Sequence, residues 1–233
     1  MHHTDIVANL QHIQENIAQL SQKYRRNPAS IQLLAVSKTK PAEFIRAAFD
    51  AGQTRFGENY LQEALSKMQS LKDLPIEWHF IGAIQSRKTR ELAEHFDWVH
   101  SVDRLKIAQR LNEQRPATLT PLNICLQINI SEETSKSGLN INEVESIVDQ
   151  IAPLPNLCLR GLMAIPAREN TLNKQREAFS RMRLILQTLQ NRHPDLDTLS
   201  MGMSADMEAA IAEGSTLLRI GTAIFGARQP TRV

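Results

Sequence analysis

The residue in the most reactive setting is Lys38, which comes two places after the apolar run 33–36 (LLAV). A lysine held where a buried strand ends is partly removed from water, and desolvation favours its neutral amine. The neutral amine is the form that attacks an aldehyde to make a Schiff base. Lys38 is therefore a candidate nucleophile, although its position alone also fits a solvated lysine at a strand end. Lys40, two residues further on, is expected to face solvent.

A candidate anion site lies near the end of the chain, in two segments that combine glycine with a hydroxyl residue. Gly202, Met203 and Ser204 precede an expected helix, and Gly221 and Thr222 follow an apolar run. Glycine lets backbone N–H groups approach a phosphate closely, hydroxyls add donors, and a helix N-terminus adds a favourable field. The composition therefore fits phosphate binding, and it equally fits ordinary turn glycines beside a capping serine.

Arg219 is a charged residue within the apolar run 217–220 (LLRI). Side chains alternate along a strand, so Arg219 shares a face with Leu217 and Gly221. If that face is interior, the guanidinium needs an acceptor, because an unpaired buried charge is costly. The sequence leaves two partners open, which are a carboxylate of the protein and a bound ligand.

Composition and spacing argue against several other kinds of site. The 27 Lys and Arg residues against 25 Asp and Glu give a net charge of +2, which does not favour a nucleic-acid binder. The seven histidines show no HExxH or cysteine-paired spacing, so no zinc site is expected. His79 lies inside an expected strand and is interpreted as a hydrogen-bonded core residue.

The chain also lacks the segments that direct a protein to a membrane. No run is long and apolar enough to span a bilayer, and the N-terminus has no apolar stretch typical of a signal peptide. Cys125 and Cys158 are far apart among apolar neighbours and are interpreted as reduced cysteines of a cytosolic protein.

These residues are positioned by short apolar runs that alternate with helical patterns. An amphipathic first helix ends at Asn27-Pro28, because the residue before proline avoids the helical region. The expected strands are 31–36, 54–57, 77–82, 97–101, 123–130, 158–162, 196–199 and 217–220. The expected helices between them are 41–52, 59–71, 86–95, 103–115, 141–152, 173–191 and 205–213.

Strand–helix alternation gives parallel pairing through right-handed crossovers. Eight such units predict an α/β fold that closes into a (β/α)8 TIM-like barrel, with an open doubly wound sheet as the alternative. A barrel of this kind places its site where strands run into the following loops. Lys38, Asn59, Ser204 and Thr222 follow the first, second, seventh and eighth strands, so we expect them at one end of the barrel. Asp103 is expected to cap the helix that follows it.

Seven segments of the chain carry a distinctive pattern: LLAVSKTKP (33–41), RFGENYLQEA (55–64), WHFIGAIQSRKTR (78–90), HSVDR (100–104), QINISEETSKSGL (127–139), LRGLMAIP (159–166) and LSMGMSADMEAAIAEGSTLLRIGTAIFGAR (199–228). In these segments the chain resembles the pyridoxal-phosphate homeostasis protein family (YggS/PROSC-like), over nearly its whole length after the first helix. The resemblance implies one domain over residues 1–233. This domain would be a barrel similar to the N-terminal domain of alanine racemase (fold type III), with residues 1–27 as a helix packed on it.

The family binds pyridoxal 5′-phosphate, and the resemblance implies this cofactor here. Lys38 would form the Schiff base, Arg219 would face the pyridine nitrogen, and Asn59 would lie beside the ring. The phosphate would be held by the backbone of Met203 and by Ser204, Gly221 and Thr222. Because an arginine only donates hydrogen bonds, it would keep the ring nitrogen unprotonated and the cofactor a poorer electron sink.

The resemblance implies a protein that carries and buffers pyridoxal 5′-phosphate and maintains intracellular vitamin B6 homeostasis, with no established turnover reaction. Racemases of this fold use a tyrosine base from a separate C-terminal domain, for which this chain is expected to have no room. Its two tyrosines, Tyr24 and Tyr60, lie in expected helices.

We therefore expect a non-catalytic, monomeric, cytoplasmic protein that can deliver the cofactor to apo-enzymes and binds neither nucleic acid nor membrane. The alternatives are a weak amino-acid racemase or lyase that uses the same cofactor, and a Schiff-base aldolase with no cofactor. Lys136 and Ser137, in a barrel-mouth loop, are a candidate secondary anion site.

Overall fold

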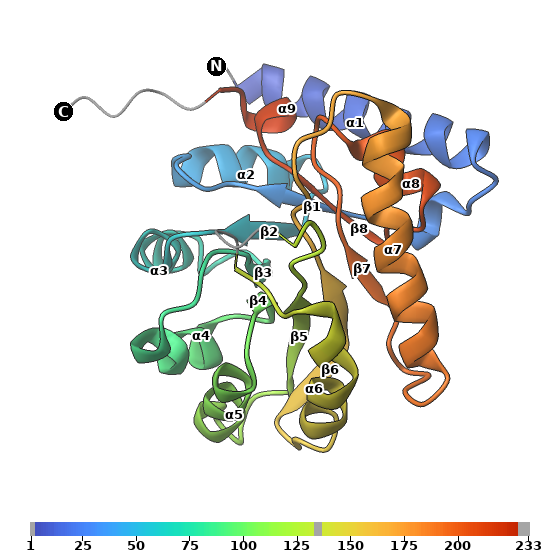
Figure 1. The fold of residues 1–233 in the computed structure, drawn as a ribbon. Coiled ribbons are helices and arrows are strands. Elements are labelled where there is room, and N and C mark those ends of the chain that lie inside the picture. The colour runs from blue at the N-terminus through green and yellow to red at the C-terminus, as the bar shows by residue number, and fades with distance from the viewer. Residues whose placement is uncertain (1–2, 133–136, 228–233) are drawn as a thin grey trace.

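Eight parallel strands close into a ring in which each strand pairs with the next and β8 pairs with β1 (Figure 1). The computed structural model describes residues 3–132 and 137–227 of the 233-residue chain. The strands are β1 (Gln32–Val36), β2 (Arg55–Glu58), β3 (Glu77–Phe80), β4 (Trp98–Val102), β5 (Leu122–Gln127), β6 (Leu157–Met163), β7 (Thr198–Ser200) and β8 (Leu217–Ile220). The expected closed barrel is confirmed, and the open-sheet alternative is wrong.

Helices follow the strands and cover the outside of the barrel (Figure 1). They are α1 (His3–Lys23), α2 (Ala42–Asp50), α3 (Leu61–Ser70), α4 (Thr89–His95), α5 (Leu105–Gln114), α6 (Val144–Ile151), α7 (Leu172–Gln190), α8 (Met207–Ala212) and α9 (Thr222–Phe225). Single turns of 3₁₀ helix lie at Pro28–Ser30, Ser86–Lys88 and Ile141–Glu143. Helix α9 has no counterpart among the expected helices, because four residues are too few to show a helical period.

The expected cap of α5 is wrong. The N-cap residue of α5 is Arg104, which makes no side-chain cap hydrogen bond. The Asp103 carboxylate instead accepts a hydrogen bond from Arg104 Nη1 at 2.7 Å. An aspartate in the sequence indicates where a helix starts. Whether it caps the helix depends on its backbone conformation and on whether its side chain is free to accept from the first-turn N–H groups.

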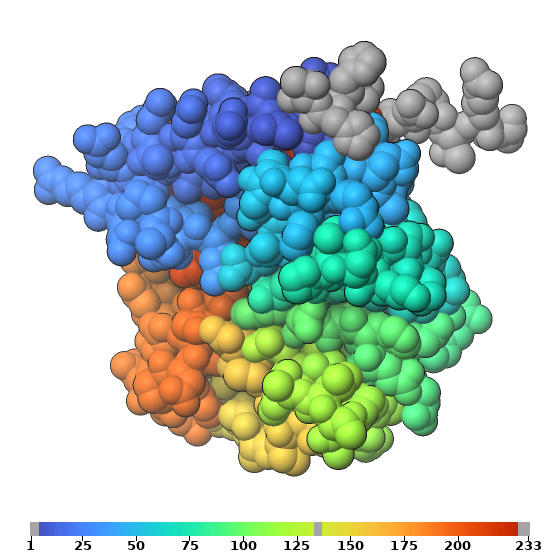
Figure 2. Space-filling model, turned by 180° about the vertical axis from the view of Figure 1, so that it is seen from behind, coloured from blue at the N-terminus to red at the C-terminus, as the bar shows by residue number. Residues whose placement is uncertain are grey.

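Helix α1 packs on the outside of the barrel beside the helices that follow β1, β7 and β8. Its expected apolar face is buried at Ile6, Leu10, Ile13 and Ile17, which join the main apolar core. The side chain of Asn9 adds a polar tie, donating to the backbone oxygen of α9 at Ile224 over 3.0 Å. In the space-filling view the dark blue N-terminal residues lie along one end of the molecule, against the lighter blue residues that follow them (Figure 2).

The interior of the barrel is polar over much of its depth. At the amino ends of the strands, Arg55 donates to Glu77 at 3.1 Å and Arg160 donates to Asn123 at 3.2 Å. A small apolar cluster, separate from the main core, consists of Trp98, Cys125 and Met163. The large apolar core lies mostly between the strands and the helices, and its burial stabilises the fold. The interior of the barrel can therefore hold charged and polar groups.

Candidate functional site

Lys38 lies in a tight turn directly after β1. The Ser37 N–H donates to the Gly57 backbone oxygen at 3.0 Å, and the Lys40 N–H donates back to the Ser37 oxygen at 3.0 Å. Thr39 has a φ of 63°, in the left-handed region that a threonine seldom adopts. Lys38 itself is partly buried. The turn therefore holds the Lys38 backbone rigidly at the carboxyl end of the barrel, as expected.

A buried ionic cluster fastens this turn to α3. The Lys67 ammonium donates to the Ser37 backbone oxygen at 2.9 Å, to Glu58 Oε1 at 2.8 Å and to Glu63 Oε1 at 2.5 Å. The Ser37 hydroxyl donates to Glu58 at 2.6 Å, and the Thr39 N–H donates to Glu63 at 2.6 Å. Burial raises the pKa of Glu58, and the charge of Lys67 opposes that rise. The residues on both sides of Lys38 are thus tied to one buried ammonium group.

The neighbouring Lys40 was expected to face solvent, but it is only partly exposed. Its side chain is partly buried, and its Nζ donates to the Ala227 backbone oxygen at 2.8 Å. Burial lowers the pKa of Lys40. This contact directs the Lys40 amine to the segment after α9.

Arg219 is buried inside the barrel, with only 4% of its surface exposed. Its Nη1 donates to the backbone oxygen of Ser200 at 2.5 Å and to its hydroxyl at 2.7 Å, and its Nη2 donates to the Ala164 oxygen at 2.9 Å. Among the described residues no carboxylate bonds to this guanidinium, and its Nε makes no hydrogen bond. Burial lowers the pKa of Arg219 to about 10, while the charge of Asp206 acts to raise it. The sequence left open a protein carboxylate as the direct partner of Arg219, and none of the described residues supplies one.

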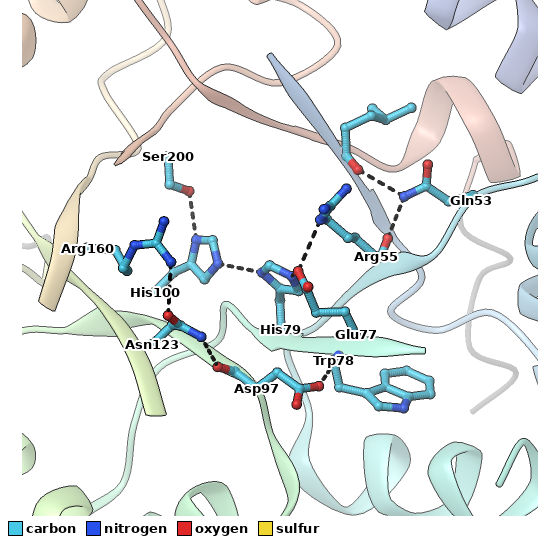
Figure 3. A network of polar contacts seen from close by, with 11 residues as sticks. Gln53, Arg55, Glu77, Trp78, His79, Asp97, His100, Asn123, Arg160 and Ser200 are labelled. Carbon is cyan, nitrogen blue, oxygen red and sulfur yellow. Dashed lines mark hydrogen bonds and ion pairs between the residues drawn. The ribbon is translucent and has the colours of Figure 1, made fainter. Parts of the chain in front are cut away.

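Two histidines, His100 and His79, lie between Ser200 and Glu77 in the interior of the barrel (Figure 3), and they extend the polar contacts that begin at Arg219. His100 Nδ1 lies 2.8 Å from the Ser200 hydroxyl, and His100 Nε2 lies 2.8 Å from His79 Nδ1. His79 Nε2 lies 2.8 Å from Glu77 Oε1. Both rings are fully buried, and burial lowers the pKa of His79 and lowers that of His100 well below its usual value. His79 is a hydrogen-bonded core residue, as expected.

Asn59, directly after β2, carries a buried polar atom without a partner. Its Oδ1 makes no hydrogen bond to any described residue. The loops after β2 and β3 touch here, since a Cβ added at Gly82 would lie 2.1 Å from the Asn59 backbone oxygen. A buried oxygen that lacks a donor costs about 1–3 kcal/mol, so the position suits a residue that meets a bound polar group.

The residues of the expected anion site follow the carboxyl ends of β7 and β8. Ser204 and Thr222 are exposed, and their hydroxyls make no hydrogen bond to the described residues. The Met203 N–H donates to Asp206 Oδ1 at 2.6 Å, so it is already engaged and its assignment as an anion ligand stays a prediction. A Cβ added at Gly221 would lie 3.0 Å from the oxygen of the adjacent β1 strand, so glycine lets the two strands meet closely here.

The structure brings the predicted residues to one sector of the barrel rim. Lys38, Asn59, Ser204 and Thr222 follow β1, β2, β7 and β8, which are consecutive in the ring in the order β7, β8, β1, β2. Spacing in the sequence gave no reason to include Glu63 and Lys67, beyond a four-residue separation typical of a surface ion pair on a helix. Lys136 lies outside the described residues, and the neighbouring Ser137 accepts a hydrogen bond from Gln127 through its backbone oxygen at 3.1 Å.

Two features are absent from residues 3–132 and 137–227. No group of three or more His, Cys, Asp or Glu residues in these ranges could hold a metal ion. Within the same ranges, no helix has both the length and the apolar composition that crossing a membrane requires.

Comparison with known proteins gives consistent matches over the whole barrel. The family model of the alanine racemase N-terminal domain matches residues 8–229. The pyridoxal phosphate homeostasis protein of Vibrio alginolyticus is 56% identical over 229 residues, which cover 97% of this chain and 98% of the relative.

Solved structures agree with the observed fold. PipY of Synechococcus elongatus PCC7942, with PLP bound, is 40% identical with a TM-score of 0.79, covering 90% of this chain and 100% of PipY. Alanine racemase from Corynebacterium glutamicum is 15% identical with a TM-score of 0.71, and the match covers 99% of this chain and 63% of the racemase. The racemase likeness concerns the fold alone.

The buried histidines predict a pH-dependent stability. An unfolded histidine binds a proton below about pH 6.5, whereas folded His100 stays neutral, so the unfolded state binds more protons and the free energy of unfolding falls as the pH falls. Each such histidine contributes up to about 1.4 kcal/mol per pH unit below that value. We expect urea unfolding between pH 7 and pH 5 to give a shallower pH slope for His100→Gln than for the unchanged chain.

The test compares the pH slopes of the free energy of unfolding of the two proteins, because groups other than His100 also titrate between pH 5 and pH 7. Burial raises the pKa values of Glu58, Asp97 and Asp206, and these carboxyls stabilise the folded state as the pH falls. These carboxyls are present in both proteins, so their contributions cancel in the difference between the two pH slopes. Equal slopes for the two proteins would show that His100 is protonated in the folded state as readily as in the unfolded one.

Proposed function

The chain belongs to the alanine racemase N-terminal domain family, among the pyridoxal phosphate homeostasis proteins, and we propose that it binds pyridoxal 5′-phosphate at the rim formed by β7, β8, β1 and β2. The observation that carries the proposal is the setting of Arg219, a buried guanidinium whose hydrogen-bond acceptors in the described chain are all uncharged. A buried cation with an open donor suits a ligand that is anionic and carries an acceptor.

Lys38 is the residue we assign to covalent attachment. When bound, the cofactor supplies an aldehyde that condenses with a primary amine. The turn at Ser37 and Thr39 fixes the Lys38 backbone, so the amine starts from a defined position. Lys40 is a poor alternative because its amine is bonded to the Ala227 oxygen.

Arg219 and Asn59 are the residues we assign to the ring. Arg219 can only donate hydrogen bonds, so if its guanidinium met the ring nitrogen of the cofactor it would keep that nitrogen unprotonated. An unprotonated ring withdraws electrons less strongly, which suits retention of the cofactor more than chemistry on a substrate. Asn59 contributes the buried Oδ1 that lacks a donor in the described chain.

The phosphate is assigned to the ends of β7 and β8. The hydroxyls of Ser204 and Thr222 are exposed and unbonded within the described chain, so they are available as donors. Gly221, where a Cβ would press on the backbone of β1, and the backbone of Met203, whose N–H donates to Asp206, complete the assigned set. The site at this rim thus offers neutral donors, together with the nearby positive charge of Arg219.

We further propose that the protein is a monomeric cytoplasmic carrier and buffer of the cofactor, which it releases to apo-enzymes, and that it has no turnover reaction of its own. Neither tyrosine is held as a base over the rim, since the Tyr24 hydroxyl donates to Glu208 and Tyr60 is 52% exposed. Cys125 and Cys158 form no disulfide, which supports a reducing compartment.

The attachment site is tested by reduction and peptide mapping. Borohydride treatment after incubation with pyridoxal 5′-phosphate should fix the added mass on Lys38, and Lys38→Ala should lose that adduct. Lys40→Ala is the matched control and should keep it, because its amine is engaged elsewhere. An adduct on any other side chain would remove the assignment, and amino-acid turnover that disappears in Lys38→Ala would overturn the non-catalytic part of the proposal.

The phosphate assignment is tested by Thr222→Val, which removes one hydroxyl and keeps the shape of the side chain. We expect the dissociation constant for pyridoxal 5′-phosphate to rise about tenfold, the cost of losing one hydrogen bond to a charged group. Binding of pyridoxal, which has no phosphate, should stay unchanged. Equal weakening of both ligands would place Thr222 away from the phosphate.

A further inference from the structure

We propose that Ser200, His100 and His79 form a one-directional hydrogen-bond chain through which Glu77, at the amino end of the barrel, serves as a remote counter-charge of Arg219, in addition to the charge of Asp206. In this role the three residues and Glu77 are positioning residues, because none of them meets the ligand directly. The consequence for a bound ring rests on the proposed function, whereas the chain itself is a property of the protein alone.

The chain is continuous across the interior of the barrel (Figure 3). Arg219 Nη1 lies 2.7 Å from the Ser200 hydroxyl, which lies 2.8 Å from His100 Nδ1. His100 Nε2 lies 2.8 Å from His79 Nδ1, and His79 Nε2 lies 2.8 Å from Glu77 Oε1. Ser200 ends β7 and Glu77 begins β3, so the chain joins the two ends of the barrel.

Chemistry fixes the direction of every proton in the chain. The ionised carboxylate of Glu77 only accepts, so His79 carries its proton on Nε2 and donates to it. Nδ1 of a neutral His79 is then an acceptor, so His100 carries its proton on Nε2 and donates to His79 Nδ1. His100 Nδ1 is therefore an acceptor as well, and the Ser200 hydroxyl donates to it while accepting from Arg219, which only donates. The order is set from the Glu77 end, and each neutral histidine has one tautomer.

The charges are confined to the two ends of the chain. His79 faces Glu77, Asp97 and Arg55, and burial is the main cause that lowers its pKa. Burial is the main cause that lowers the pKa of His100, and the positive charge of Arg219 lowers it further, as a protonated His79 would. The neutral rings therefore separate a positive guanidinium from a negative carboxylate, whose own pKa is lowered chiefly by the hydrogen bond from His79.

Remote placement of the counter-charge leaves Arg219 open. A carboxylate bonded directly to the guanidinium would occupy its donors and neutralise its field at the rim. Here Glu77 is shared with Arg55 at 3.1 Å and is partly exposed, so the anionic end of the chain contacts solvent. The His79 ring is held by stacking on Trp98, with centroids 5.3 Å apart and planes at 8°, which keeps the chain in register.

The first test uses the protein without cofactor. Nitrogen-15 correlation spectra of the imidazole rings should show both His79 and His100 neutral and protonated on Nε2 from pH 6 to pH 8. A proton on Nδ1 of either ring, or a charged ring in this range, would overturn the chain whatever the protein binds.

The second test is a double-mutant cycle read from the pH titration of bound-cofactor absorbance. Glu77→Gln keeps the shape of the acceptor but removes its charge, so the hydrogen-bond chain polarises Arg219 less, and the apparent pKa of the chromophore should fall by about 0.5 unit. In a Ser200→Ala background, which interrupts the chain, Glu77→Gln should produce no such fall. An undiminished fall in that background would mean that Glu77 acts through space and would overturn the proposal.

The matched control is Asp197→Asn, which removes an anion from the amino-end layer without touching the chain. Asp197 pairs with Arg160, and its hydrogen bonds do not include either histidine. The chromophore pKa should therefore stay unchanged, and a fall equal to that of Glu77→Gln would contradict the chain. If neither the parent protein nor any variant binds pyridoxal 5′-phosphate, the proposed function is wrong. The tautomers of His79 and His100 would still test the hydrogen-bond chain, because they are measured without the cofactor.

Discussion

The burial of one guanidinium inside a barrel of parallel strands governs the arrangement of its interior. A cation taken out of water must be surrounded by acceptors, or it destabilises the fold. Arg219 finds them in backbone and hydroxyl oxygens at the carboxyl ends of β6 and β7, and the histidines beyond them carry the polar contacts to the opposite end. The apolar packing that stabilises the fold is consequently found mainly outside the ring, between strands and helices.

A second buried cation organises the outside of the rim in a comparable way. Lys67, on α3, gathers the backbone on one side of Lys38 and two carboxylates into one cluster. The two cations have different roles, since Arg219 keeps a donor free while the ammonium of Lys67 makes three hydrogen bonds. The rim thus combines a rigidly anchored turn with an open cationic group, and this combination suits a ligand that is both attached and held by charge.

The sequence was sufficient for the features that follow from local pattern. The alternation of apolar runs and helices predicted the closed barrel, and the position of Lys38 after a buried run predicted its place at the rim. The contacts of Arg219 were beyond local pattern, because Arg219 and Ala164 are 55 residues apart, Ser200 and His100 are 100 residues apart, and these pairs meet only in the folded barrel. The cap of α5 and the contact of Lys40 with Ala227 were missed because both depend on backbone geometry that composition does not encode.

The role we propose for Arg219 is to present a hydrogen-bond donor to the ring nitrogen of the cofactor. The nitrogen-15 chemical shift of pyridoxal 5′-phosphate that is labelled at the ring nitrogen and bound to the protein reports on this contact. We expect the shift of an unprotonated, hydrogen-bonded pyridine nitrogen throughout the range from pH 6 to pH 8. The shift of a protonated pyridinium nitrogen in this range would contradict it.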